Sequence, residues 1–206
     1  MELRKDIVKD IISQALGTNY IKVYARKCEL KDIDLNTYKN FLNQNHLQGY
    51  SWADFRKGLF LEDELVEVIG IRTKGNHSKE SELVRLCTRK GLKVLGGFSR
   101  LLKSFGRSLI SYIDVSTFSG GGYDAVGFRI VKKNPPVYFY VNLITSSVEP
   151  RYTYMRKCIE RKFKKGELKY WNAKETEEIN MYKNGFARIW NCGTYKVFWD
   201  PKAKHV

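Results

Sequence analysis

Asp114 is a candidate catalytic carboxylate because of its place in the sequence. It ends the apolar run Leu109–Asp114, which predicts a strand, and the glycine-rich segment Gly120–Gly122 follows shortly after it. Active-site residues collect where strands end at the opening of a sheet. There Asp114 could accept the proton of an attacking amine, or it could accept backbone N–H groups in a turn. The sequence leaves both interpretations open.

His46 is a second candidate, at the end of a predicted helix and between Asn45 and Gln48. A histidine in this place can act as a base, complement the helix dipole as a cation, or contact a phosphate. Asn45 and Gln48 have amide side chains of the kind that reads base edges in nucleic acid. The structural alternative is that His46 only hydrogen-bonds the end of the helix.

A glycine pair, Gly96 and Gly97, opens a predicted amphipathic helix. The first N–H groups of a helix lack intrahelical partners, and the helix dipole favours negative charge there. Lys93, Ser99 and Arg100 flank the glycines.

The segment 151–171 is the strongest candidate for contact with nucleic acid. Residues 151–169 include eight basic side chains and two acidic ones. Aromatic residues, among them Tyr152, Tyr154 and Trp171, are interleaved and could stack on exposed bases. The alternative is a solvated charged helix with one aromatic edge on the core. The predicted phosphate contacts are Arg151, Arg156, Lys157, Arg161, Lys162, Lys164 and Lys165.

The overall charge agrees with a polyanionic partner. The chain has 206 residues, and 37 Lys and Arg against 22 Asp and Glu give a formal net charge of +15. Such an excess attracts nucleic acid, although a merely solvated surface is the alternative. We expect no membrane partner, because no apolar run approaches the roughly 20 residues that span a bilayer. The four cysteines are far apart without a CxxC pair, so neither a metal site nor a disulfide is predicted.

The hydrophobic pattern predicts an α+β or mixed α/β fold. The last two strands, 186–190 and 195–199, are expected to form a hairpin around Asn191–Gly193. The expected helices cover 3–16, the segment from an Asp34 cap to about residue 45, the segment from Gly96 to Phe105, 123–126 and 175–183. The expected strands cover 20–25, 55–61, 65–71, 82–87, 109–114, 128–131, 137–141, 186–190 and 195–199.

The middle of this order resembles the GNAT acyltransferase superfamily. Its members have a Gln/Arg-x-x-Gly-x-Gly/Ala loop between a strand and a helix, and Lys93 and Gly96 fit that spacing, whereas Phe98 replaces the last small residue. The motif Tyr-x-x-x-Gly-Phe is also present, as Tyr123–Phe128. The resemblance implies a mainly antiparallel sheet flanked by helices and Tyr123 as general acid. It also implies an acyl-CoA donor whose phosphates are held at the loop by the predicted cofactor-binding residues Lys93, Gly96, Gly97, Ser99 and Arg100. A core aromatic is the alternative role for Tyr123.

A more detailed resemblance covers most of the chain. Several blocks are similar, in the same order, to the domain that follows the nuclease in phage homing endonucleases of the very-short-patch-repair-like class. The blocks are Lys22–Cys28, Phe41–Gly49, Glu82–Cys87, Val94–Phe105, Ile110–Phe128, Pro135–Val141 and Gly185–Trp199. Since the nuclease half is absent here, the resemblance implies no nuclease activity. A weaker similarity, through Ser111, Asp114, Gly120–Gly122, Tyr123 and Tyr138–Tyr140, reaches the Mom-type phage DNA-modification proteins.

Together these observations predict a GNAT-like domain over 1–150 and a basic, aromatic extension over 151–206, a helix–hairpin appendage packed on the same domain. We expect a phage-type protein in the cytoplasm of the infected cell that binds nucleic acid, DNA rather than RNA. If it is an enzyme, it transfers an acyl-type group to a base amine. The alternatives are a non-catalytic DNA-binding module and a phage protein that binds a host protein.

Overall fold

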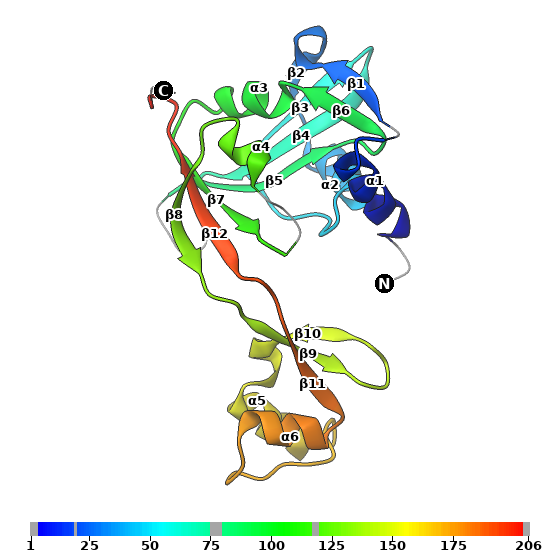
Figure 1. The fold of residues 1–206 in the computed structure, drawn as a ribbon, viewed down its shortest axis with the longest axis vertical. Coiled ribbons are helices and arrows are strands. Elements are labelled where there is room, and N and C mark those ends of the chain that lie inside the picture. The colour runs from blue at the N-terminus through cyan, green and yellow to red at the C-terminus, as the bar shows by residue number, and fades with distance from the viewer. Residues whose placement is uncertain (1–3, 19, 75–79, 117–119, 204–206) are drawn as a thin grey trace. The chain divides into compact units, whose positions relative to one another are not determined.

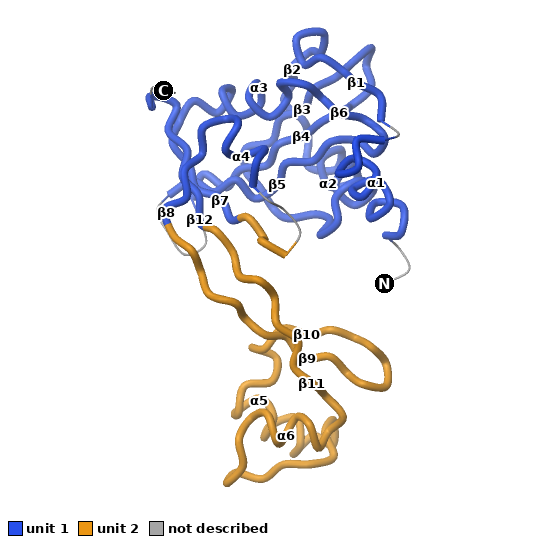
Figure 2. Tube along the Cα trace, in the orientation of Figure 1, with its two compact units in different colours: residues 1–112, 120–131, 196–206 blue, residues 113–119, 132–195 orange. Residues whose placement is uncertain are grey.

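The computed structural model describes residues 4–18, 20–74, 80–116 and 120–203. Its contacts divide the chain into two compact units, which Figure 2 shows in different colours. Unit 1 consists of residues 1–112, 120–131 and 196–206, and unit 2 of residues 113–119 and 132–195. This division differs from the boundary expected at residue 150. Residues 138–142 fall in unit 2 because they form a strand that pairs with two later strands of that unit.

A seven-stranded sheet forms the centre of unit 1, and three of its strands lie partly in unit 2. The order is β2-β3-β4-β5-β7-β12-β8, in which β2 to β5 are antiparallel neighbours and β5 is parallel to β7. The strands are β2 (Glu29–Asp32), β3 (Phe55–Leu61), β4 (Glu64–Arg72), β5 (Glu82–Thr88), β7 (Leu109–Asp114), β8 (Arg129–Asn134) and β12 (Thr194–Trp199). The predicted α+β class with a mainly antiparallel sheet flanked by helices is confirmed.

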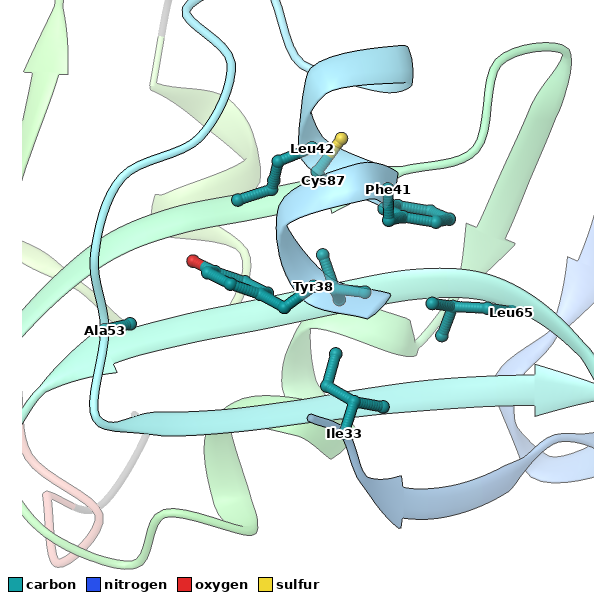
Figure 3. Close-up of a cluster of buried hydrophobic side chains, with 8 residues drawn as sticks. Ile33, Tyr38, Phe41, Leu42, Ala53, Leu65 and Cys87 are labelled. Carbon is teal, nitrogen blue, oxygen red and sulfur yellow. The ribbon is translucent and has the colours of Figure 1, made fainter. Parts of the chain in front are cut away.

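Helices of unit 1 cover both faces of this sheet (Figure 1). On one face α2 (Leu35–Asn45) buries Tyr38 and Leu42 against Val68 and Cys87, in the cluster that Figure 3 shows. Successive residues of a strand point to opposite faces. The neighbour of Val68, Glu67, accordingly contacts the first residue of α3 (Gly97–Lys103) on the other face.

Two short strands lie outside the large sheet, where β1 (Ile21–Tyr24) pairs in parallel with β6 (Leu92–Leu95). The helix α1 (Lys5–Ala15) precedes β1, and Asp10 of α1 accepts a hydrogen bond from the backbone N–H of Gly91 at 2.7 Å. The short helix α4 (Gly121–Asp124) connects β7 to β8. Residues Lys93–Leu95, expected in a loop, are therefore held in a strand because β1 supplies their hydrogen-bond partners.

Unit 2 has its own three-stranded antiparallel sheet, in the order β10-β9-β11. Its strands are β9 (Tyr138–Asn142), β10 (Val148–Pro150) and β11 (Phe186–Trp190), and its helices are α5 (Arg156–Lys164) and α6 (Glu177–Lys183). Aromatic and aliphatic side chains form one buried cluster between the sheet and the helices. Its members include Tyr140, Tyr154, Ile159, Met181 and Phe186.

The predicted C-terminal hairpin is wrong, although both of its strands exist. The strand β11 pairs with β9, whereas β12 lies between β7 and β8 in the large sheet. The reason lies at the expected turn, Asn191–Gly193. There Asn191 forms hydrogen bonds with Val137, next to β9, and thereby continues the pairing of β11 with β9. The backbone N–H of Val137 donates to Asn191 Oδ1 at 2.8 Å, and the N–H of Asn191 donates to the Val137 carbonyl at 3.0 Å.

Candidate functional site

Two glycines with different backbone conformations follow β6, one in the connection and one at the start of α3. Gly96 has a φ of 77°, in the left-handed region that favours glycine. Gly97 starts α3, and no side chain caps the first N–H groups of this helix. Lys93 lies earlier, on β6, where its amine is 5.2 Å from the centre of the Tyr20 ring. Ser99 follows in the first turn of α3 and is half-buried.

A cavity of about 550 Å³ opens beside this connection. Its lining is formed by Tyr24, Ala25, Arg26, Leu95, Gly96 and Arg100. Gly96 and Arg100, two of the predicted cofactor-binding residues, are therefore in this cavity. Tyr24, Ala25 and Arg26 were not predicted, because they come from a segment about seventy residues earlier that only the β1–β6 pairing brings here.

The two arginines give this cavity a positive charge. Arg100 donates from Nη1 to the carbonyl oxygens of Ala25 and Cys28, at 2.6 Å for the latter. The Arg26 guanidinium lies 5.2 Å from the centre of the Tyr24 ring. Neither guanidinium forms an ion pair with a carboxylate of the described residues. The cavity therefore suits an anionic ligand such as a phosphate.

The parallel strands β5 and β7 separate soon after they meet. Glu82 pairs with Ile110, and the Ile110 N–H donates to the Ser81 carbonyl at 2.8 Å. One residue further, the Ser111 hydroxyl donates to the Leu83 carbonyl at 3.0 Å. No later backbone pairing joins these two strands in the part of the chain that the structure describes. The strand ends are thus free to diverge on the side where α3 and α4 begin.

Tyr123 lies next to this point of separation. Its hydroxyl is 3.5 Å from the Ser111 hydroxyl, and its ring centre is 5.3 Å from that of Phe98 and 5.0 Å from that of Phe128. Burial raises the pKa of Tyr123, so the phenol keeps its proton at neutral pH. The aromatic at position 98 therefore packs against Tyr123, and it connects the first turn of α3 with the predicted general acid.

Glu67 is a residue of this region that sequence reasoning missed. It is 3% exposed, its Oε1 accepts from the Thr88 hydroxyl at 2.9 Å, and its Oε2 has no hydrogen-bond partner among the described residues. Burial raises the pKa of Glu67 to about 7. The signal in the sequence was a single carboxylate within the apolar run Leu65–Ile71.

The other two predicted catalytic residues, Asp114 and His46, each accept a hydrogen bond from a nearby backbone N–H group. Asp114 Oδ1 accepts the N–H of Ser116 at 2.9 Å, which is the turn-forming alternative. His46 Nδ1 accepts the N–H of Gln48 at 3.1 Å. Burial, followed by the nearby Arg85 and Arg4 charges, lowers the pKa of His46 to about 4. This imidazole is therefore neutral at pH 7 and a weak base.

The predicted base readers near His46 differ from each other. Asn45 uses both ends of its amide within the protein, because Nδ2 donates to the Phe41 carbonyl at 2.9 Å and Oδ1 accepts the N–H of Lys90 at 3.1 Å. Gln48 has an exposed side chain. Only Gln48 is therefore available to a partner in this arrangement.

The basic residues of unit 2 fall into two groups. Four of them have partners within unit 2. Arg151 Nε is 3.6 Å from Glu177, and Arg156 donates to the Ala173 carbonyl. Lys162 pairs with Glu167 at 3.0 Å, and Lys164 pairs with Glu160 at 2.7 Å. Lys157, Arg161 and Lys165 are exposed and form no ion pair with a carboxylate of the described residues.

Two further properties concern metals and membranes. The described residues contain no group of three or more His, Cys, Asp or Glu side chains that could hold a metal ion. Cys28 and Cys87 are buried free thiols, Cys158 is half-buried and Cys192 is exposed. No helix formed by the described residues is long and apolar enough to cross a lipid bilayer.

Comparison with known proteins gives matches at the level of structure. No protein-family model and no curated protein matches the sequence. Similar solved structures include the ribosomal-protein-S18-alanine N-acetyltransferase from Escherichia coli, with 7% identity over 86% of this chain and 96% of that chain and a TM-score of 0.47. Another is aminoglycoside 6′-acetyltransferase type Ii, with 12% identity, 86% and 99% coverage, and a TM-score of 0.46.

A third is Arabidopsis thaliana Naa50 in complex with a bisubstrate analogue, with 12% identity, 84% and 99% coverage, and a TM-score of 0.44. The three structures are similar to this chain over most of its length, at sequence identities of 7–12%.

Proposed function

We propose that unit 1 binds an acyl-CoA-type thioester and transfers its acyl group to an amine. The cavity at Gly96 carries this proposal, because it is lined by two arginines that have no carboxylate partner among the described residues, beside the start of α3. A phosphate-bearing ligand would neutralise the charges of Arg26 and Arg100. Its oxygens would also accept hydrogen bonds from the backbone N–H groups at the start of α3. Such a donor supplies an activated carbonyl group.

Tyr123 is the residue that this proposal assigns to chemistry. In acyl transfer the amine nitrogen bonds to the carbonyl carbon, the carbon–sulfur bond breaks, and the leaving thiolate needs a proton. Tyr123 can give that proton because burial keeps its phenol protonated. The Ser111 hydroxyl, fixed by its bond to the Leu83 carbonyl, lies beside the phenol. The proton of the attacking amine passes to solvent or to a second group of the acceptor.

Phe98 favours a second candidate, a binding module without catalysis. Its ring lies in the first turn of α3 and packs on both Tyr123 and Phe128, with centre distances of 5.3 Å and 5.8 Å. The ring therefore takes up space that a small residue would leave to a ligand. In this second function the cavity binds an anion, and no group is transferred.

Calorimetric titration of the full chain with CoA, acetyl-CoA and pantetheine tests the proposal. We expect CoA and acetyl-CoA to bind and pantetheine, which lacks the nucleotide phosphates, to bind at least about tenfold more weakly. Ligand at about 100 times its Kd should also stabilise the chain by about 2.7 kcal/mol. No binding of acetyl-CoA at millimolar concentration would refute both the transfer reaction and the donor site.

A further inference from the structure

The helix α5 of unit 2 separates its apolar and cationic residues onto opposite sides. Ile159 is fully buried in the core of unit 2. With about 100° between successive helical residues, Lys157, Arg161, Lys164 and the following Lys165 all lie within about 60° of the direction opposite Ile159. Lys157, Arg161, Lys164 and Lys165 are all exposed. We call these four residues the α5 basic face.

Three of the four charges on this face have no ion-paired carboxylate among the described residues, although Glu167, which pairs with Lys162, also interacts with the Arg161 and Lys165 charges. Lys164 pairs with Glu160 at 2.7 Å. Lys157, Arg161 and Lys165 form no ion pair with a carboxylate within the described residues. Unit 2 as a whole has 13 Lys and Arg against seven Asp and Glu. The face is therefore a net positive surface on a positive unit.

The helix dipole does not account for this arrangement. Cations in the last turn of a helix complement its dipole, and Arg161 and Lys164 are in that turn. Lys157 is in the first turn, where the dipole disfavours a cation, and the first turn contains no acidic residue. An external polyanion that spans the length of the helix would stabilise the cations at both ends of it.

We propose that the α5 basic face binds the phosphate backbone of double-stranded DNA. Lys157, Arg161 and Lys165 follow each other at intervals of four residues, so their side chains project about 6 Å apart along one line. No aromatic residue lies on this face, so the contacts neutralise phosphates and leave the bases unread. Duplex DNA presents the dense array of phosphates that such a line of cations requires.

A lipid surface fits this helix less well than DNA. The one half-exposed aromatic of α5, Phe163, is 39% exposed and lies within about 40° of the Ile159 direction, away from the basic face. An interfacial membrane helix needs apolar residues that enter the lipid, and α5 turns its apolar side to the protein core. The proposal also stands apart from acyl transfer, because the cavity of unit 1 contributes no residue to it.

The test is fluorescence anisotropy of a labelled 20-base-pair duplex with the full chain, from about 50 to 300 mM KCl. The slope of log K against log salt concentration is negative, and each phosphate contact adds about 0.9 to its magnitude, which is the quantity compared below. The variant Lys157→Gln/Arg161→Gln/Lys165→Gln should lower that slope by about 2 to 3 and weaken binding at 100 mM KCl about tenfold or more. Circular dichroism and thermal melting establish that the variant is folded.

The matched control is Lys5→Gln/Lys9→Gln/Lys22→Gln, which removes the same charge from exposed residues of unit 1. It should change the affinity by less than about twofold and leave the slope within about 0.5 of the original. The proposal is overturned if both triple variants lose affinity equally, since the binding would then depend on net charge alone.

A gain of binding provides a second, independent readout. Glu160→Gln releases Lys164 from its ion pair, so the slope should rise by about 0.9 and the affinity for duplex should increase. Tighter binding of single-stranded DNA than of duplex would overturn the proposal. Competition by anionic phosphatidylserine vesicles at lipid concentrations at which duplex does not bind would also overturn it, and would assign the face to membranes.

Discussion

The carboxyl group of Glu67 lies in the space that a side chain on Gly97 would need. A Cβ atom at residue 97 would come within 2.8 Å of the Glu67 Cδ atom and of the Val94 Cγ1 atom. The start of α3 therefore packs directly on β4 because residue 97 has no side chain. Contact between backbone and carboxyl group, rather than any special φ, requires glycine here.

Gly97→Ala should destabilise unit 1 by about 1–3 kcal/mol, because the carboxyl group and the backbone of α3 must move apart. Urea unfolding at pH 7 measures this change. The matched control is Gly122→Ala in α4, where an added Cβ meets no atom within 4 Å. Alanine is favoured over glycine in a helix by about 0.5–1 kcal/mol, so the control should not lose stability. Equal losses in both variants would contradict the packing argument.

Glu67 should make the stability depend on pH in a particular direction. Burial raises its pKa from 4.5 to about 7, so between these values the folded chain holds a proton that the unfolded chain has lost. The contribution of Glu67 is therefore fully present below about pH 4.5 and is lost as the pH rises through about 7. The size of the loss is on the order of 3 kcal/mol.

Glu67→Gln, which is uncharged at every pH and still offers an oxygen to Thr88, is the test of this dependence. Urea unfolding at several values between pH 4.5 and 8.5 should show the original chain losing stability relative to the variant as the pH rises. Parallel stability curves for the two proteins would show that Glu67 ionises normally in the folded state.

Arg26→Gln should weaken the binding of CoA about tenfold, since a hydrogen bond to a charged group contributes about 1.5–3 kcal/mol. Pantetheine binding should stay the same, because that fragment lacks the phosphates. The control is Arg107→Gln, an exposed arginine outside the cavity that also lies over an aromatic ring, at 4.8 Å from the centre of Phe105. Calorimetry of all three proteins makes the comparison. A loss in the Arg107 variant equal to that in the Arg26 variant would remove the case for a specific phosphate contact.

Tyr123→Phe should lower kcat for acyl transfer by about 10²–10⁴ while the Kd of the donor changes little, because the phenol acts on the leaving group. Ser111→Ala, which removes the neighbouring hydroxyl, should have a smaller effect on kcat and should shift its pH dependence. Rates of CoA release with simple amines measure both. If Tyr123→Phe keeps full activity, the phenol is a core residue and not the acid.

Local signals in the sequence predicted most of the elements, because strands and helix ends depend on nearby residues. The bounds of β3, β7 and β11 agree with the prediction, and Asp34 caps α2 as expected, accepting the N–H groups of Asn36 and Thr37. Pairing partners were harder to predict. Alternation in 186–190 indicates a strand but does not indicate that its neighbour is β9 rather than the strand next in sequence.

The candidate site was predicted in the same partial way. Gly96 and Arg100 line the cavity. They could be predicted because a glycine pair before a helix is a local sequence pattern. Arg26 and Glu67 were missed because each reaches the loop through a tertiary contact, β1 on β6 for the first and β4 on α3 for the second. The sequence next to the loop contains no pattern that predicts such long-range contacts.

The strand β12 has a consequence for the order in which this chain folds. It lies between β7 and β8, so residues 194–199 complete a sheet whose other strands all precede residue 135. Trp199 fixes this strand further by donating from its indole nitrogen to the Val126 carbonyl at 3.0 Å. During synthesis on the ribosome the gap between β7 and β8 remains open until this late segment has emerged. Unit 2 can therefore assemble its own core before the last strand of the large sheet, β12, has been added to unit 1.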